Sequence, residues 1–415
     1  MAFFTYREGQ LYAESVPLDK IANQIQTPVY CYSASALRQN YRSYTRYFKP
    51  ENSLVCYAVK ANSNQAILSL LGKMGAGADV VSEGELRRAL HAGIPAEKIV
   101  YSGVAKTARE MKFALAQDIY QFNVESEPEL ELLNKVALAA GKRASIAFRI
   151  NPDIDARTHA KISTGKASNK FGIAWSGIPE AYARAAALPG ITVQGIDLHI
   201  GSQLTELAPF KQAFICLAEL TEQLRGEGHK ISVLDIGGGL GIAYDDQGPQ
   251  PPELGDYAAL ANDILGGLDC RIIIEPGRSM VGDTGILLSE VIYVKQGEHD
   301  EFLIIDAGMN DLLRPSMYDA FHEITPVKPG NNELRPYQIV GPICETGDTF
   351  ARSRKLPRMQ AGDLITIRDA GAYGAVMASS YNSRPLVPEV LVDGDDFTVV
   401  RKRPGIDELI SLDSL

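Results

Sequence analysis

The sequence is poor in the residues that build disulfide frameworks and metal sites. Its 415 residues include five widely separated cysteines: Cys31, Cys56, Cys216, Cys270 and Cys344. An odd count without a CxxC pair argues against a disulfide framework and against a zinc or redox motif. The six histidines are scattered and form no HExxH pattern, so no metal site is expected. A reduced, cytoplasmic setting fits this cysteine usage best.

Long apolar runs and an excess of positive charge are also missing. No uncharged apolar run reaches 18 residues, so no transmembrane helix is expected. The first residues, MAFFTYREGQ, lack a basic segment followed by an apolar one, so no signal peptide is expected. The formal net charge of −10 argues against nucleic acid or an anionic membrane as a partner. With 45% hydrophobic and 22% charged residues, the chain has an ordinary globular composition.

One pattern recurs between residues 54 and 278. A short β-rich run ends in polar or glycine residues, and a stretch with apolar residues at i, i+3 and i+4 follows it. The eight runs are LVCYAVK (54–60), ADVVS (78–82), KIVYSG (98–103), YQFNVES (120–126), SIAFRINP (145–152), VQGIDLHIGS (193–202), VLDIGGG (233–239) and RIIIEPGRS (271–279). Eight alternating strands and helices predict an α/β fold with a parallel sheet, either a closed (β/α)8 TIM barrel or an open doubly wound sheet. The barrel is favoured because polar residues follow nearly all the strands, whereas an open sheet gathers them at one switch point.

The alternation of β-rich and helical stretches stops after about residue 285. Short β-rich runs such as EFLIIDAG and DLITIRDAG are separated by Pro, Gly and Asp turns, without long helical stretches between them. This pattern predicts a C-terminal all-β domain of sandwich or barrel-like type. The strand-like start, FFTYREGQLYAESV, can pair with it. The predicted organisation is therefore an N-terminal segment (1–32) that packs with the β domain, a barrel (33–284) and the β domain (285–415).

In a TIM barrel, residues at the carboxyl ends of the strands face one common mouth. The polar and glycine residues at these predicted ends are Lys60, Asp79, Ser82, Asn151, His199, Ser202, Gly237, Gly238, Gly239, Glu275 and Arg278. Each alone has a structural explanation, since a lysine at a strand end can simply extend into water and a lone histidine often belongs to the core. The functional interpretation depends on their convergence.

The stretch DIGGGLGI is neither GxGxxG nor a P-loop, but it offers successive backbone N–H groups to a phosphate. Arg278 can add a charge-assisted contact. An amine, a phosphate site, an imidazole and a carboxylate together meet the needs of pyridoxal 5′-phosphate (PLP). Its aldehyde takes a lysine as a Schiff base, and its pyridine nitrogen takes an acid that keeps it protonated.

Eight stretches between about residue 54 and residue 390 carry a family resemblance. They are YAVKANSN, NPDIDARTHAKISTGKASNKFGI, HIGSQ, DIGGGLGI, EPGRSMVG, MNDLLRPSMYDAFHEI, GPICETGDTFARSRKLP and GAYGAVMASSYNSRP. In this order they resemble the PLP-dependent decarboxylases with an alanine racemase-like barrel, and most closely the bacterial diaminopimelate decarboxylases. The chain departs from that pattern in CETGD, where CESGD is more common, and in MASSYNSRPL, where MASNYNSRPR is common. Neither departure changes a candidate catalytic side chain.

The resemblance implies roles for residues around the cofactor. Lys60 would form the Schiff base, His199 would stack on the pyridine ring, and Glu275 would pair with the pyridine nitrogen. The same resemblance implies that further residues hold PLP, with Tyr373 at its phosphate: Asp79, Ser202, Gly238, Gly239, Gly277, Arg278 and Tyr373.

The resemblance also implies residues that handle the substrate. Arg278, Arg314, Tyr318 and Tyr373 would bind it, the first three at a carboxylate, and Glu345 would accept its ammonium group. Cys344 would protonate the carbanion that remains when CO2 departs. In the family, Cys344 and Glu345 reach the site of the neighbouring subunit, so a homodimer with shared active sites is expected.

The implied activity is decarboxylation of meso-2,6-diaminopimelate to L-lysine and CO2, the last step of lysine biosynthesis. An arginine fork at Arg314 suits the distal carboxylate of this substrate, whereas ornithine has none. The basic residues of segment 157–170 could attract a dicarboxylate, or they could simply be a solvated loop.

Three alternatives to this activity remain. They are a decarboxylase of another basic amino acid or of carboxynorspermidine, a racemase, and a non-catalytic decarboxylase-like regulator. Glu275 argues against the racemase, which has an arginine at that position and hence a weaker electron sink. The presence of both Lys60 and Cys344 argues against the regulator.

Overall fold

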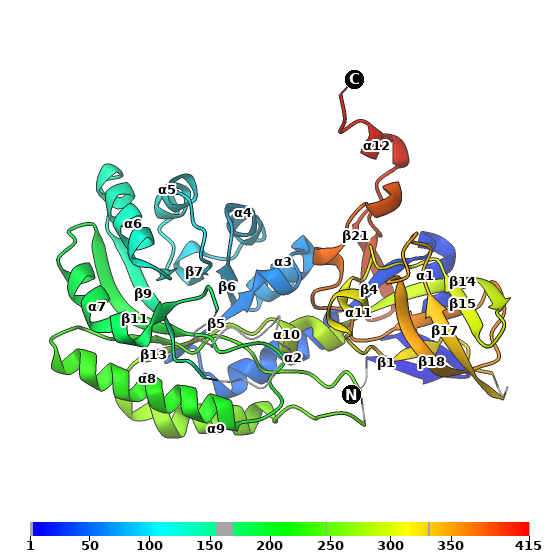
Figure 1. The fold of residues 1–415 in the computed structure, drawn as a ribbon, viewed down its shortest axis with the longest axis horizontal. Coiled ribbons are helices and arrows are strands. Elements are labelled where there is room, and N and C mark those ends of the chain that lie inside the picture. Colours follow the sequence, from blue (N-terminus) through cyan, green and yellow to red (C-terminus); the bar gives the residue numbers. More distant parts are fainter. Residues whose placement is uncertain (1–2, 155–168, 246, 331–332, 415) are drawn as a thin grey trace. The chain divides into compact units, whose positions relative to one another are not determined.

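The computed structural model describes residues 3–154, 169–245, 247–330 and 333–414 (Figure 1). The chain divides into two compact units. One unit comprises Asn40–Ile242 and Pro249–Ser279, and the other comprises Met1–Gln39, Ala243–Gly248 and Met280–Leu415. In the described part of the chain, no helix has the length and apolar character needed to cross a bilayer.

The first unit is built around eight parallel strands that close on themselves, which confirms the predicted TIM barrel (Figure 1). The barrel strands are β5 (Ser53–Ala58), β6 (Gly77–Val80), β7 (Ile99–Tyr101), β8 (Gln121–Val124), β9 (Ala144–Asn151), β11 (Ile191–Leu198), β12 (Val233–Asp235) and β13 (Arg271–Ile274). Each strand pairs with the next along the chain, and β13 pairs with β5 to complete the ring. The short β10 (Ile173–Ala174) adds a further parallel pairing to β9 beside this ring.

Helices surround these strands, as Figure 1 shows. They are α3 (Gln65–Lys73), α4 (Glu83–His91), α5 (Ala108–Ala116), α6 (Glu127–Ala139), α7 (Ile178–Ala186), α8 (Ala208–Gly226) and α9 (Leu254–Leu265). The polar residue before several of them starts the helix, because its side chain accepts a hydrogen bond from a free backbone N–H of the first turn. Asn64, Ser82, Thr107 and Ser126 are such caps, on α3, α4, α5 and α6.

The barrel interior changes character along its axis. Near the amino-terminal ends of the strands, Leu54, Val100, Val233 and Ile273 form a buried apolar cluster. Towards the carboxyl ends the buried side chains are polar or charged: Asp79, Asn123, Asp197, Asp235 and Glu275. Because a buried charge costs free energy unless it is paired, this polar half of the interior needs an explanation beyond stability.

Several strands end earlier than the sequence predicted. Strand β5 ends at Ala58, and Lys60 lies in a one-turn 3-10 helix (Val59–Ala61). Strand β11 ends at Leu198, so His199 and Ser202 lie in the loop that follows it. In both cases β-forming residues continue beyond the last hydrogen bond of the sheet, but the backbone turns away from the extended conformation there. These turns place the polar residues beyond the strand ends.

The second unit is mainly β, as predicted, and among its described residues are short helices such as α1 (Leu18–Ile25) and α12 (Ile406–Ile410). Its main sheet has the order β18-β17-β15-β14-β4-β20-β21. These strands are β18 (Thr349–Pro357), β17 (Leu334–Val340), β15 (Glu301–Ile305), β14 (Gly285–Gln296), β4 (Val29–Ser33), β20 (Glu389–Asp393) and β21 (Asp396–Arg401). Beside them, β16 (Ile324–Pro326) pairs with β19 (Leu364–Ile367), which pairs with β14.

The N-terminal segment is part of this β unit. Strand β4 inserts between β14 and β20, although these are some 100 residues apart in the chain. The antiparallel strands β1 (Phe4–Arg7), β2 (Gln10–Ala13) and β3 (Val16–Pro17) precede it. Leu11 and Val29 share one buried cluster with Ile286, Val327 and Val390. Burial of these apolar side chains therefore holds the two ends of the chain in one core.

Candidate active site

Lys60 and Asp79 meet at the carboxyl ends of β5 and β6. The Lys60 Nζ donates a hydrogen bond to the Asp79 Oδ2 at 2.7 Å, and the side chain of Asp79 is fully buried while Lys60 is partly exposed. A pair with one buried partner is stabilised mainly because separation would leave a buried charge uncompensated. The amine is therefore held at the strand end while its side chain stays partly accessible to solvent.

Glu275 lies next to two further buried acids. Carboxylate oxygens of Glu275, Asp197 and Asp235 lie within 4.8 Å of one another. Burial first, and then the neighbouring carboxylates, raises the pKa of Glu275 well above its usual value. Burial likewise raises the pKa of Asp197 well above its usual value and that of Asp235 to about 6. Like charges this close cannot all ionise without compensation, so the cluster retains protons or attracts a cation.

Polar side chains connect the acids to the neighbouring strands. Asn123 on β8 donates through Nδ2 to the Asp235 Oδ2 at 3.2 Å and to the Ser102 Oγ at 3.1 Å. The Asp235 Oδ1 accepts the backbone N–H of Gly237 at 3.0 Å. Asp235 thus joins the acid cluster to the first residue of the glycine turn, and the two features form one network.

His199 is fixed by the glycine turn. The Gly238 backbone N–H donates to the His199 Nδ1 at 3.2 Å, so Nδ1 is the unprotonated nitrogen of the ring. Burial lowers the pKa of His199 well below its usual value, and the positive charges of Arg149 and Lys60 lower it further. The ring is therefore neutral near pH 7 and presents a flat uncharged face.

The glycine turn leaves room only for glycine. A Cβ at Gly238 would lie 2.3 Å from the Glu275 carbonyl oxygen, and one at Gly239 would lie 2.6 Å from the Gly201 carbonyl oxygen. Gly237 and Gly239 also have positive φ angles of 63° and 109°. Beside the turn, the Arg278 Nη2 donates to the Ser202 Oγ at 3.1 Å, and Arg278 is buried.

This donor set fits PLP. A glycine turn whose backbone a phosphate can approach closely and a guanidinium suit a phosphate, a neutral ring suits stacking, and a buried acid suits a protonated pyridine nitrogen. Lys60 supplies the primary amine with which an aldehyde can form a Schiff base. Gly277 lies in the turn between Glu275 and Arg278 and is buried with them. The cofactor-binding residues predicted in the barrel therefore lie around the ends of β5, β6, β11, β12 and β13.

The other predicted residues lie in the β unit. Arg314 and Tyr318 begin and end the short helix α11 (Arg314–Tyr318). Arg314 is buried, and its Nη1 lies 2.7 Å from the His322 Nε2. Tyr373 has a φ of 56°, in the left-handed region that a non-glycine residue seldom adopts. Such backbone strain is concentrated at functional sites.

Cys344 and Glu345 lie on the surface of the β unit in the single chain. Both are exposed, and the Cys344 backbone N–H donates to the Asn382 Oδ1 at 3.1 Å. The Tyr381 hydroxyl donates to the Glu345 Oε1. The local structure thus anchors the Cys344 backbone and the Glu345 carboxylate and leaves both residues accessible.

Two polar residues that the sequence placed at strand ends have local structural roles. Ser82 caps α4 by accepting the Glu85 N–H, and Asn151 donates to the Phe171 carbonyl oxygen. Most of the basic segment 157–170 lies outside the described residues. The sequence reasoning overlooked Asp197 and Asp235, although each is a single acid within an apolar strand run, GIDLH and VLDIG. An unpaired acid in a strand that is buried on both faces is the pattern that could have identified them.

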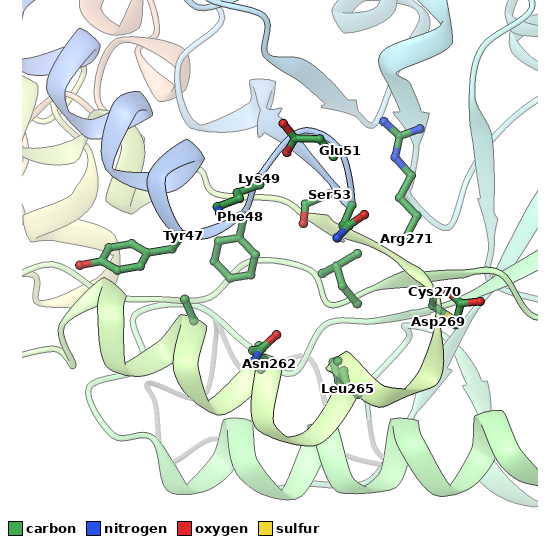
Figure 2. A pocket seen from close by; sticks show the side chains of 15 residues that line it. Tyr47, Phe48, Lys49, Glu51, Ser53, Asn262, Leu265, Asp269, Cys270 and Arg271 are labelled. Carbon is green, nitrogen blue, oxygen red and sulfur yellow. The ribbon is translucent and has the colours of Figure 1, made fainter.

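A separate pocket of about 660 Å³ is shown in Figure 2. It is lined by Phe48, Ser53, Leu265 and Arg271, among others. Ser53 and Arg271 are the first residues of β5 and β13, so this pocket lies at the amino-terminal ends of the strands. That face of a TIM barrel serves stability, whereas the carboxyl-terminal face carries chemistry. We therefore place the candidate active site at the opposite ends of the strands.

Comparisons with known proteins give a consistent result. A family model described as "Pyridoxal-dependent decarboxylase, pyridoxal binding domain" matches residues 34–282. A diaminopimelate decarboxylase of Zymomonas mobilis is 50% identical over 412 residues, which cover 98% of this chain and 97% of that protein. The crystal structure of a Helicobacter pylori diaminopimelate decarboxylase complexed with L-lysine is similar with a TM-score of 0.92 and 42% identity, over 95% of this chain and 98% of that one. A corresponding complex from M. jannaschii has a TM-score of 0.95 and 37% identity, over 99% and 98% of the two chains.

Proposed function

The chain belongs to the pyridoxal-dependent decarboxylases, in the group that contains the diaminopimelate decarboxylases, and we propose that it converts meso-2,6-diaminopimelate to L-lysine and CO2. The observation that carries this proposal is the convergence of an amine, a buried acid and a glycine turn at one end of the barrel. Lys60, Glu275 and Gly238 come from three different strand ends. Relatives of the same full length bear this activity in their names.

PLP is the proposed cofactor. When bound, it supplies an electron sink for the electron pair that remains after CO2 departs. Lys60 would hold its aldehyde end through Nζ, and His199 would cover one face of its ring. The Glu275 carboxylate would accept a hydrogen bond from the protonated pyridine nitrogen, and the positive charge there favours the ionised form of this carboxyl group. The phosphate would lie against the glycine turn, within reach of the Gly239 N–H, and would contact the hydroxyl of Tyr373.

The remaining proposed cofactor contacts come from the same strand ends. They are Asp79, Ser202, Gly239, Gly277 and Arg278. Asp79 accepts a hydrogen bond from Lys60 and so keeps this amine at the strand end. Arg278 reaches Ser202 and is positioned by it.

The substrate residues follow from the two amino acid ends of diaminopimelate. Arg314 and Tyr318 bind the distal carboxylate, because a guanidinium fork matches a carboxylate in two hydrogen bonds. Glu345 accepts the distal ammonium group. Arg278 and Tyr373 line the reacting end. Cys344 then delivers the proton of its Sγ to the carbon that has lost CO2.

We also propose that the working form is a cytoplasmic homodimer with shared active sites. Cys344 and Glu345 are exposed in the single chain, as residues that act in a partner's site have to be. The five cysteines are all free thiols, which suits a reducing compartment.

A substrate panel tests the function. The purified protein is incubated with PLP and with meso-diaminopimelate, its other stereoisomers, ornithine or arginine, while CO2 and amine products are followed. Release of CO2 and L-lysine from the meso isomer alone is expected. Turnover of ornithine or arginine without lysine formation would refute the assignment. A visible absorbance band that disappears in Lys60→Ala, but persists in Lys135→Ala on α6, separately tests the amine's role.

A further inference from the structure

Arg314 is held by a buried histidine. The Arg314 Nη1 and the His322 Nε2 are 2.7 Å apart, and the His322 Nδ1 is 2.7 Å from the Arg368 carbonyl oxygen. Arg314 and His322 are 6% and 1% exposed, so little water competes for these bonds. Two short polar contacts on opposite sides of the ring fix its orientation.

The chemistry of the two partners fixes the tautomer of His322. A carbonyl oxygen can only accept, so Nδ1 carries the proton and donates it to Arg368. A guanidinium can only donate, so Nε2 is the unprotonated nitrogen and accepts from Arg314. In a protonated ring, Nε2 would also carry a hydrogen and would face the N–H of Arg314 as a second donor. His322 therefore has to be neutral and in a single tautomer to orient the guanidinium.

The backbone below His322 is anchored by the sheet. The Arg368 backbone N–H donates to the Glu323 carbonyl oxygen at 2.8 Å, directly beside the histidine. This bond continues the antiparallel pairing of β16 with β19, where Ile324 lies opposite Ile367. The residue whose carbonyl oxygen selects the tautomer is thus tied to the sheet through its own N–H group, directly after the last pair of the ladder.

An aromatic ring supports the face of the guanidinium. The Arg314 Cζ lies 4.4 Å from the centre of the Tyr244 ring, within the range of a cation–π contact. The same ring meets His322 edge to face, with the ring centres 5.2 Å apart and the planes at 76°. Tyr244, His322 and Arg314 therefore form one packed group in which the edge and the face of the guanidinium are both held.

We propose that His322 and Tyr244 are positioning residues that pre-orient Arg314 and thereby set the selectivity of the enzyme for ligands with a distal carboxylate. This inference rests on the proposed function, in which Arg314 binds that carboxylate. A guanidinium that is already held loses less rotamer entropy on binding than a free one. More of the free energy of the two hydrogen bonds between the guanidinium and the carboxylate is then available for binding.

Two ligands separate this role from a general structural one. L-Lysine keeps the amino acid end of the substrate that decarboxylation leaves untouched, whereas cadaverine has the same carbon chain and both amines but no carboxylate. Each is measured as an inhibitor of meso-diaminopimelate decarboxylation by the PLP-loaded enzyme. The ratio of their inhibition constants reports the distal carboxylate contact alone.

We expect His322→Phe, which keeps a ring but removes both hydrogen bonds, to weaken L-lysine inhibition roughly tenfold or more, the usual scale for a lost hydrogen bond to a charged group. Cadaverine inhibition should change less than roughly twofold. The KM for diaminopimelate should rise more than kcat falls, because the contact belongs to ground state and transition state alike. His322→Gln, whose amide oxygen can accept from Arg314, should recover part of the selectivity.

Two further variants keep the test decisive. Tyr244→Leu leaves the His322 hydrogen bonds in place and should reduce the lysine-to-cadaverine selectivity in the same direction, even if His322→Phe does not fold. His299→Phe changes an exposed histidine of the same unit and should alter neither constant.

The outcomes distinguish this inference from the proposed function. If lysine and cadaverine inhibit the wild-type enzyme equally well, the distal carboxylate assignment itself is overturned. The wild type could instead bind lysine more tightly than cadaverine. If the His322 and Tyr244 variants then keep the same ratio of inhibition constants, or bind both ligands more weakly to the same extent, only the positioning role is overturned.

Discussion

At the scale of single residues, the acids of the barrel determine how the site responds to pH. Glu275, Asp197 and Asp235 share a buried space, and each has a raised pKa mainly because of burial. Such groups bind more protons in the folded chain than in the unfolded chain. The cofactor-free protein therefore loses stability as pH rises through the range between the unfolded and folded pKa values.

Asp235→Asn tests this electrostatic cost. The pKa of Asp235 is about 6 in the folded chain and about 4 when unfolded, so its unfavourable contribution develops as pH rises between these values. We expect urea unfolding of the cofactor-free variant to show a shallower decline in stability with pH than the wild type. Asp263→Asn, on the exposed side of α9, is the control. Parallel pH curves for Asp235→Asn and the wild type would contradict the prediction.

Cys344→Ala tests the proton donor. Loss of a positioned general acid should lower kcat by about 10² to 10⁴-fold. The cofactor absorbance should remain, because Cys344 has no proposed contact with PLP. Steady-state kinetics and a visible spectrum measure the two effects, and Cys216→Ala on α8 is the matched control. A kcat close to that of the wild type would remove Cys344 from the mechanism.

At the scale of the elements, the glycine turn after β12, which is the proposed phosphate site, is hydrogen-bonded to the acids and to His199. The Asp235 carboxylate accepts the N–H of Gly237, the Gly238 N–H donates to His199, and the Glu275 N–H donates to the Gly237 carbonyl oxygen at 2.8 Å. A change in the path of this turn therefore moves several proposed cofactor contacts together.

Gly238→Ala is the test at this scale. Its new Cβ would lie 2.3 Å from the Glu275 carbonyl oxygen, so the turn or the end of β13 has to shift. Overpacking of this kind costs about 1–3 kcal/mol of stability. We expect weaker PLP binding in a fluorescence titration and a lower unfolding midpoint. Gly267→Ala, where nothing lies within 4 Å of the new Cβ, should behave as the wild type. Equal effects of the two variants would argue against a tight turn.

At the scale of the whole molecule, the proposed dimer puts Lys60 and Cys344 of one complete site on different chains. The chain itself supplies both residues, in separate compact units. The boundaries at residues 32 and 284 stay predictions.

Mixing two inactive variants tests the shared sites. Lys60→Ala and Cys344→Ala homodimers each lack one residue in every site. After subunit exchange, half of the dimers are mixed, and one of their two sites is intact, so about a quarter of full activity should return. Decarboxylation before and after mixing is the measurement. If activity does not return although mass spectrometry shows mixed dimers, both residues act within one chain.

Alternating β and helical runs are local patterns, so they were enough to favour the barrel over an open sheet and to predict the β domain. The short motifs supplied the candidate residues, several of them only through the family resemblance. Composition alone could not show where β5 and β11 end, since β-rich residues continue beyond the last ladder bond. Only the tertiary structure brought Asp197, Asp235 and Glu275 together and placed His322 against Arg314 and Tyr244. These groupings depend on which strands and loops become neighbours after folding, and burial among them, rather than residue type, sets their charge and orientation.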